Sequence, residues 1–269
     1  MSLTQTEVGP SLPRYRARFG EGAKLAGARW LVVLVLLAVW EIWTRLAGGS
    51  DLIAPPSAIL RALFTDILPD PEIRGAIALT IFEVAAAYAL SVAGGLALGI
   101  AIGSTKLSRQ ALFPIVLLLY AIPQVVLLPL FMLGFGIGPE AKIAFGFSHG
   151  LFPILVNVVA GMQNMNPLYL NAARAMGARR SDIIRNLVFP HMVASFFTGL
   201  RLSMTMTLLG VILAELYVSM TGVGYFTKLF AERFDPAPLF ALIGTLAVIA
   251  IVLNELVRVV ERRFTRWKN

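Results

Sequence analysis

The sequence contains no cysteine and unusually few charged residues. Without cysteine there is no disulfide framework, no thiolate nucleophile and no cysteine-based zinc site. Only 14% of the 269 residues are charged, 58% are apolar, and the mean hydropathy is +0.78. Soluble domains carry roughly 25% charged residues, and a soluble globule of this size could not enclose so much apolar surface. The composition excludes an ordinary soluble enzyme and predicts an all-α, polytopic membrane protein.

Motifs for phosphate, metal and hydrolytic chemistry are missing or misplaced. No G-x-x-x-x-G-K-[ST] phosphate loop occurs, so we do not expect this chain to bind ATP by itself. No group of His, Asp and Glu has metal-ligand spacing. Gly146–Gly150 matches the G-x-S-x-G pattern of serine hydrolases, but that pattern requires a strand-to-helix turn and here lies in an apolar helix. We therefore expect no catalytic residue, no metal and no cofactor in this chain.

Six apolar segments are long enough to cross a bilayer, which requires about 20 apolar residues per helix. Three prolines interrupt the third segment, so we expect a kink or break near Ile122 and Pro123. The chain divides into a polar N-terminal tail (1–29), a transmembrane domain (30–260) and a short C-terminal tail (261–269). The predicted segments are 30–47, 76–103, 111–134, 141–162, 190–219 and 239–260.

Basic residues concentrate on one side of this predicted topology. With the N-terminus inside, the inner segments 1–29, 104–110, 163–189 and 261–269 hold most of the 23 Lys and Arg residues, whereas the outer loops collect acids. The positive-inside rule therefore accounts for the net charge of +8 without a nucleic-acid partner. We predict a multi-pass protein of the inner membrane with both termini in the cytoplasm.

Ionisable residues inside the apolar segments are costly there and are either functional or paired. The spacing of Glu41 and Arg45, near the outer end of the first segment, predicts a local ion pair. The same interpretation holds for Glu255 and Arg258 at the inner end of the last one.

Arg201 lies eleven residues after Pro190, which predicts a position near the middle of the membrane. It either contacts an anionic solute or pairs with Glu83 or Glu215. Glu215 lies too far along the same helix to reach Arg201, so any partner must come from another helix or subunit.

Gly95, Gly99 and Gly103 recur every four residues on one face of the second segment. Small residues at this spacing allow two helices to approach closely in a membrane. The sequence leaves open whether the partner helix belongs to the same chain or to another subunit.

The polar stretch between the fourth and fifth segments predicts two short helices joined by a glycine turn. Asn166 is placed to cap the first helix, with Pro167 at its first position, and Gly177 to end it in a left-handed turn. Ser181 is placed to cap the second helix, which we expect to end before Pro190. These helices would form a compact projection on the inner face.

This stretch resembles the EAA loop in permease subunits of type I ATP-binding cassette (ABC) importers, of the nitrate/sulfonate/taurine type. The resemblance begins near Leu52, and Ile122-Pro123, Gly199-Leu200-Arg201 and Gly222-Val223-Gly224 follow in the family's order. It implies the permease fold and an ATPase-coupling loop at 166–190. The residues of this loop that we expect to couple the permease to the ATPase are Asn171, Ala172, Ala173, Gly177, Arg179, Asp182 and Pro190.

The resemblance also implies function and partners. Two copies of the permease would form the solute pathway, two separate ATPase subunits would bind ATP and Mg²⁺ and dock on the loops, and a periplasmic or lipid-anchored binding protein would deliver the solute. That solute would be a small organic or inorganic compound such as a sulfonate, taurine or nitrate. The alternative is an autonomous ion-coupled secondary transporter that uses the intramembrane charges.

Three residues depart from the family pattern. Asn171 replaces the usual Glu of the loop, and Glu83 and Tyr120 stand where relatives often carry Arg. The candidate pathway residues predicted from the sequence are Glu83, Tyr120, Arg201 and Glu215.

Overall fold

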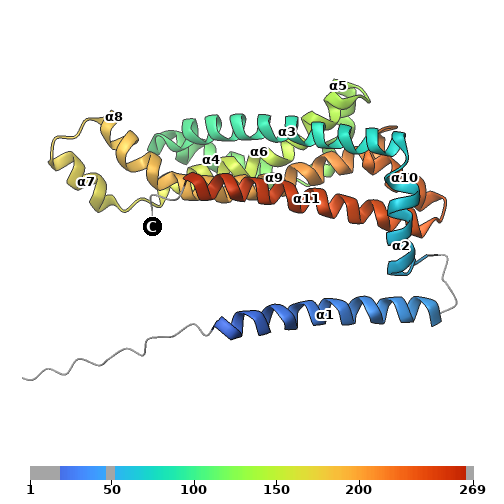
Figure 1. Cartoon of the computed structure of the whole chain (residues 1–269). Helices are drawn as coiled ribbons and strands as arrows, with labels where there is room; N and C mark the ends of the chain where they lie inside the picture. The colour runs from blue at the N-terminus through green and yellow to red at the C-terminus, as the bar shows by residue number, and fades with distance from the viewer. Residues whose placement is uncertain (1–18, 47–51, 265–269) are drawn as a thin grey trace, which may run out of the picture.

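The structure is a computed structural model that describes residues 19–46 and 52–264. Helices and short turns make up all of this described part, which confirms the predicted all-α class. Long helices lie nearly parallel, and short helices cross the two ends of the bundle (Figure 1).

All six predicted membrane segments correspond to helices in the structure. Five single helices are long and apolar enough to span a bilayer, and the third segment is a bent pair, broken by 83°. The break falls at the predicted Ile122 and Pro123, because proline has no N–H to continue the helix. The spans are α1 (Phe19–Leu46), α3 (Pro71–Gly103), α4 (Lys106–Ala121) with α5 (Leu128–Phe135), α6 (Pro139–Gln163), α9 (Phe189–Val218) and α11 (Pro236–Phe264).

Short elements connect these spans. A 3₁₀ turn, η2 (Gln124–Leu127), separates α4 from α5, and α2 (Pro56–Ala62) continues into a π-helical turn, η1 (Leu63–Ile67). The stretch before α9 contains α7 (Pro167–Ala175), α8 (Arg180–Ile183) and a π-helical turn, η3 (Ile184–Val188). A further short helix, α10 (Val223–Glu232), precedes α11.

The expected end of the second loop helix before Pro190 is wrong. Ile183, Val188 and Phe189 all keep helical backbone angles, so α8, η3 and α9 form one continuous helical segment from Ser181 to Val218. The wider π-helical turn accommodates Pro190, which lacks an N–H and would clash with the preceding turn of a regular helix.

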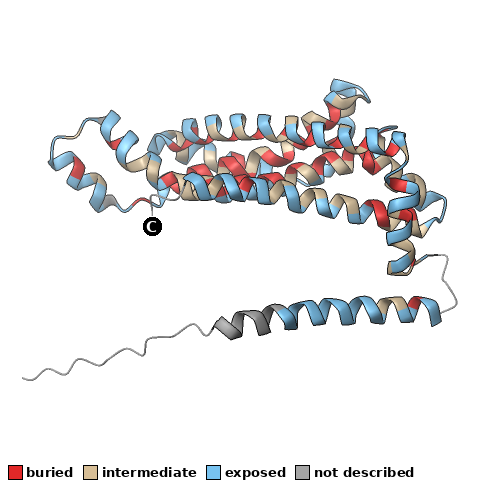
Figure 2. Cartoon of the chain, viewed as in Figure 1, coloured by how far each residue is buried: buried red, intermediate tan, exposed pale blue. Residues whose placement is uncertain are grey.

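The core of the bundle is α6, packed between α3 and α9. The predicted glycine face of α3 meets α6 of the same chain: a methyl group at Gly95 would lie 2.7 Å from Cβ of Ile154, and one at Gly99 equally close to Cβ of Val158. On the other side, a methyl group at Gly150 of α6 would lie 2.1 Å from Oγ1 of Thr207. These glycines let three backbones approach without intervening side chains. Buried positions accordingly concentrate along the facing sides of these helices (Figure 2).

Helix α1 lies apart from the bundle and exposes most of its apolar side chains (Figures 1 and 2). The predicted ion pair of Glu41 with Arg45 is present at 2.6 Å. The Glu41 carboxylate also accepts hydrogen bonds from the Ser57 N–H (3.0 Å) and hydroxyl (2.7 Å), and so caps the N-terminus of α2. Trp40 packs edge-on against Phe240 of α11. These contacts attach α1 at one end only.

The bundle has two distinct ends (Figure 1). The α7 end carries α7 and α8, and α11 ends there (Figure 1). The α10 end carries α2 and α10. Most of the predicted N-terminal tail (1–18), the short stretch 47–51 and the last five residues lie outside the described part of the chain.

We predict that Gly95→Leu lowers the free energy of unfolding by about 1–3 kcal/mol, because the new side chain would force α3 away from α6. The midpoint of thermal unfolding in detergent measures the effect. Gly244→Leu in α11 is the control, since nothing lies within 4 Å of a methyl group at Gly244. Equal midpoints for the two variants would contradict the close contact.

Candidate functional site

The turn after α7 has the backbone geometry that the sequence predicts. Gly177 has φ +77°, a left-handed conformation that glycine adopts without strain. Its N–H donates to the Arg174 carbonyl, and the Ala178 N–H donates to the Ala173 carbonyl, both at 3.0 Å. This pair of bonds is a Schellman motif, which ends a helix and reverses the chain. At the start of α7, the Asn166 side chain accepts the Leu168 N–H at 2.9 Å, which confirms the predicted cap.

The cap of α8 differs from the prediction. Asp182, not Ser181, caps this helix: its carboxylate accepts the N–H of Arg179 at 3.2 Å. Asp182 is the third helical residue and Arg179 the residue before the helix, so the bond is one half of a capping box. Ser181 lies inside α8.

Most predicted loop residues lie on the surface of the α7 end. Asn171, Ala172, Gly177, Arg179 and Asp182 are exposed, Pro190 is partly covered, and Ala173 is buried. The exposed apolar side chains beside them include Leu168, Tyr169 and Met176, the last with 81% of its surface accessible. A polar and apolar mixture of this kind suits a protein partner.

A second group of interest is a buried charged cluster near the α10 end. Lys142 of α6 forms an ion pair with Glu83 of α3 at 2.6 Å, and their side chains are 3% and 0% exposed. The Lys142 ammonium also lies 3.4 Å from the carbonyl and hydroxyl oxygens of Thr221. Buried charges are tolerated only when they are paired in this way.

Glu215 of α9 extends this cluster to the turn before α10. Its carboxylate accepts the Thr80 hydroxyl at 2.6 Å and the Gly224 N–H at 2.8 Å, and the Thr80 hydroxyl oxygen accepts the Val223 N–H at 3.0 Å. Gly222 has φ +101°, and a methyl group there would lie 2.0 Å from a Glu215 oxygen. Polar contacts therefore tie α3, α6, α9 and the α9–α10 turn together.

These contacts bear on the predicted pathway residues. The Glu83 and Glu215 side chains are fully buried inside the bundle in this conformation, and each has partners within the chain. Their part in a solute pathway stays a prediction.

The predicted partner of Arg201 is wrong. Its guanidinium pairs with Glu261 of α11 at 3.0 Å, neither with Glu83 nor with Glu215. The partner does come from another helix, as expected. Glu261 belongs to the charged last turns of α11, and α9 is continuous with α8, so counting from Pro190 does not measure depth in the membrane. At the same end of α11, the predicted pair of Glu255 with Arg258 is present.

Tyr120 occupies the last turn of α4, immediately before the break. Its ring stacks on Phe152 of α6, with ring centres 5.4 Å apart, and 38% of the residue is exposed. Of the four predicted pathway residues, Tyr120 and Arg201 are therefore accessible in the isolated chain.

The residues of the G-x-S-x-G pattern serve helix packing. The Ser148 hydroxyl donates to the Phe145 carbonyl of its own helix at 2.7 Å. His149 is buried, and its Nδ1 lies 3.0 Å from that same carbonyl oxygen. Within the described part of the chain, no group of His, Asp and Glu could hold a metal ion.

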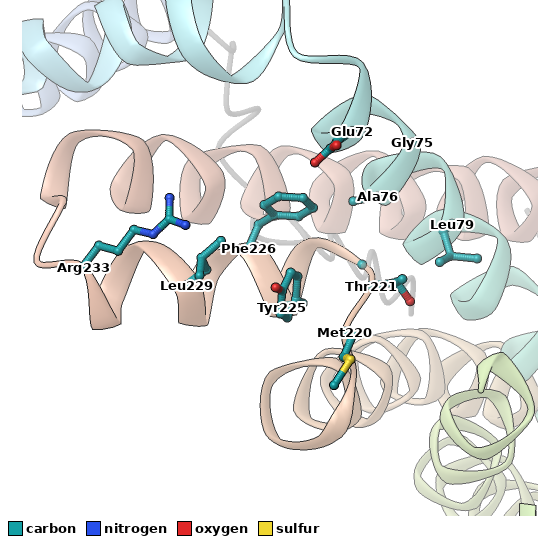
Figure 3. Close-up of a pocket in the computed structure, with 11 residues that line it drawn as sticks. Glu72, Gly75, Ala76, Leu79, Met220, Thr221, Tyr225, Phe226, Leu229 and Arg233 are labelled. Carbon is teal, nitrogen blue, oxygen red and sulfur yellow. The ribbon is translucent and has the colours of Figure 1, made fainter. Parts of the chain in front are cut away.

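A pocket of about 570 Å³ opens at the α10 end, between the start of α3 and α10 (Figure 3). Its floor includes Thr221 and Gly222 of the turn that the buried cluster holds. Aromatic and aliphatic side chains line most of it, with one acid and one base beside them: Leu79, Met220, Tyr225, Phe226, Leu229, Glu72 and Arg233.

Lys142 is the residue of this cluster that the sequence analysis does not single out, because it lies at the start of the predicted segment 141–162. A lysine inside an apolar segment, like the acids at positions 83 and 215, is a signal for a buried pair.

A helical bundle with several membrane spans, two exposed short helices at one end and a charge-bearing core is the architecture of a multi-pass membrane protein. Residues 91–266 match the family described as "Binding-protein-dependent transport system inner membrane component". The chain belongs to this family. It is the permease subunit of an ABC importer, a multi-pass inner-membrane protein without a catalytic site of its own, whose ATPase is a separate chain.

Several relatives align over most of the chain. The putative aliphatic sulfonates transport permease protein SsuC of Bacillus subtilis is 27% identical over 99% of both chains. The taurine transport system permease protein TauC of Escherichia coli is 29% identical, over 87% of this chain and 86% of that protein. A nitrate import permease protein NrtB of Leptolyngbya laminosa is 28% identical, over 87% and 85%.

The fold also matches a solved structure. A chain of the MetNI methionine ABC transporter, determined in an inward-facing conformation, superposes with a TM-score of 0.63 at 18% identity. The match covers 72% of this chain and 96% of that one. The predicted type I permease fold is thereby confirmed.

We predict that Lys142→Met destabilises the protein by about 3–5 kcal/mol, because it leaves the Glu83 carboxylate buried without its cation. Thermal unfolding in detergent measures the loss. The double variant Lys142→Met/Glu83→Gln removes both charges and should recover most of the stability.

The control is Lys228→Met, which removes the exposed ion pair with Glu232. We expect it to change stability by less than about 1 kcal/mol. If Lys142→Met were as mild as this control, the buried pair would not hold the bundle together.

Proposed function

We propose that two copies of this chain form the solute pathway of a type I ABC importer. In this proposal, α7 transmits the conformational changes of the ATPase to that pathway. The proposal rests on the structure of the α7 end. An exposed short helix is held at a fixed angle by a Schellman turn, and the segment that follows runs without interruption into a membrane span. A load on α7 therefore acts on a membrane helix and not on a loose loop.

The same proposal assigns an orientation and partners. The α7 end faces the cytoplasm, because the loop 163–189 and the charged last turns of α11 carry the basic residues expected there. Two ATPase subunits dock on the two α7 helices. A periplasmic or lipid-anchored binding protein approaches the α10 end, where the pocket lies.

The solute is a small organic or inorganic oxyanion such as a sulfonate, taurine or nitrate. The support is the names of the relatives, which are permeases for aliphatic sulfonates, taurine and nitrate. No unpaired cation marks the core of the described structure, since Lys142 and Arg201 both have acidic partners. Specificity therefore rests largely on the binding protein.

The family match rules out the alternative that the sequence leaves open, an autonomous secondary transporter driven by an ion gradient. The buried Glu83–Lys142–Glu215 cluster is accounted for by contacts among helices of the chain.

We predict that the purified chain hydrolyses no ATP, and that hydrolysis and uptake begin only when its ATPase subunit and binding protein are added. The reason is that no phosphate-binding loop occurs in its sequence. Phosphate release measures hydrolysis, and radiolabelled taurine and nitrate in proteoliposomes measure uptake. ATP hydrolysis by the chain alone would contradict the proposal.

We predict that Gly177→Val abolishes binding of the ATPase while membrane insertion persists. A β-branched residue at φ +77° costs about 1–3 kcal/mol, and the turn would relax to another angle. Co-purification of the ATPase with the tagged permease measures binding. Ala178→Val is the control, because this adjacent residue does not have a positive φ. Normal co-purification of Gly177→Val would show that the turn is not the docking element.

A further inference from the structure

The break between α4 and α5 contains a polar residue for which neither the fold nor the coupling loop accounts. Gln124 is the only polar side chain between Tyr120 and Gly134, a stretch that is otherwise entirely apolar. It begins η2, immediately after Pro123. A carboxamide is costly at membrane depth, and its retention there calls for a polar neighbour or a polar ligand.

The backbone around Gln124 also requires polar surroundings or a covering protein. The helix axis turns by 83° at this point, and Pro123 offers no N–H. Ala121, Ile122 and Pro123 are all exposed in the isolated chain. Non-helical backbone is tolerated within a membrane only where protein covers it or where it lines a water-filled cavity. Lipid therefore does not cover this face of the chain.

One aromatic and one polar contact join the break to α6 and lie one helical turn apart. Tyr120 stacks on Phe152, and the carboxamide oxygen of Gln124 lies 3.5 Å from the Ser148 hydroxyl. The spacing is four residues on each side, so both contacts lie on one face of α6. The three side chains with polar tips are partly accessible: Tyr120, Gln124 and Ser148.

Hydrogen-bond donors remain free on this face. Among the described residues, none accepts a hydrogen bond from the Gln124 NH₂ group or from the Tyr120 hydroxyl, while the Gln124 oxygen faces Ser148. No Lys or Arg occurs between Arg109 and Lys142, and Lys142 is paired with Glu83. The free N–H and O–H donors suit a group that accepts hydrogen bonds, as the oxygens of an oxyanion do.

We propose that Gln124 and Tyr120, beside Ser148, donate hydrogen bonds to the oxyanion group of the solute as it crosses the membrane. This inference rests on the proposed function and names the residues of the pathway. Neutral donors hold an anion less tightly than an arginine would, because they form hydrogen bonds without a full opposite charge. Weak binding of this kind lets a solute leave the site as well as enter it.

The absence of native cysteine allows a direct test of accessibility. Gln124→Cys and Ser148→Cys, each in the complete transporter in proteoliposomes, are treated with the anionic reagent 2-sulfonatoethyl methanethiosulfonate. Only a thiol that meets water ionises and reacts, so we expect labelling at least about tenfold faster than for Ile251→Cys. Ile251 lies on α11 and is 63% exposed in the isolated chain. Labelling of Gln124→Cys no faster than this control would overturn the proposal.

A charge substitution at Gln124 tests whether this site contacts an anionic solute. Gln124→Glu keeps the shape but places a negative charge on the site, so we expect uptake of taurine and nitrate to fall by at least about tenfold, the effect of roughly 1.4 kcal/mol of repulsion. Gln124→Asn, which keeps the carboxamide, should retain part of the uptake. Gln163→Glu, the same substitution at an exposed residue at the end of α6, should transport normally.

The outcomes separate this inference from the proposed function. Normal uptake by Gln124→Glu would overturn the inference alone. Absence of ATP-dependent uptake by the unmodified complex would overturn the proposed function. If Gln124→Glu failed to co-purify with the ATPase, the labelling rates of the two cysteine variants would still decide the inference.

Discussion

The close approach of α6 to α3 and α9 is the constraint on which the structure depends. In a membrane, lipid competes equally well for apolar side chains, so helices associate through close backbone contact and polar interactions. Gly95 and Gly99 of α3 provide this contact on one side of α6, and Gly150 of α6 provides it on the other. Side chains between three backbones this close are shielded from water, so a charged group among them needs a partner. The Glu83–Lys142 pair lies within this frame and would be unfavourable without it.

The same frame holds the α9–α10 turn. Glu215 projects from α9, but its hydrogen bonds go to Thr80 of α3 and to the Gly224 N–H beyond the turn. The turn also forms part of the floor of the pocket at the α10 end. The pocket and the buried charges are therefore neighbouring parts of one polar network. A partner that pressed on the pocket floor would act on the contacts that join three membrane helices.

Features with a local cause were predictable from the sequence. Pro123 lacks an N–H and breaks its helix, Gly177 adopts a positive φ and ends α7, and Glu41 lies one turn from Arg45. Features that depend on which helices become neighbours were not. Arg201 pairs with Glu261, sixty positions away, because α9 and α11 are adjacent, and no spacing rule within one helix carries that information. The continuity of α8 with α9 was also missed, because a π-helical turn accommodates a proline that normally marks a boundary.

The continuity of α8 with α9 gives the proposed coupling a mechanical basis. Ser181 to Val218 form one helical segment of 38 residues, about 57 Å long, which exceeds the hydrocarbon layer of roughly 30 Å. A displacement of α7 and α8 therefore moves α9 as a lever and not through a hinge. The far end of this lever carries Glu215 and the turn that it holds, whereas α4 of the broken span packs on α3 and α6, and α5 packs on α6 and on Ala214 of α9. In the proposed coupling, motion at the α7 end therefore reaches the Glu215 network at the α10 end along one continuous helical segment.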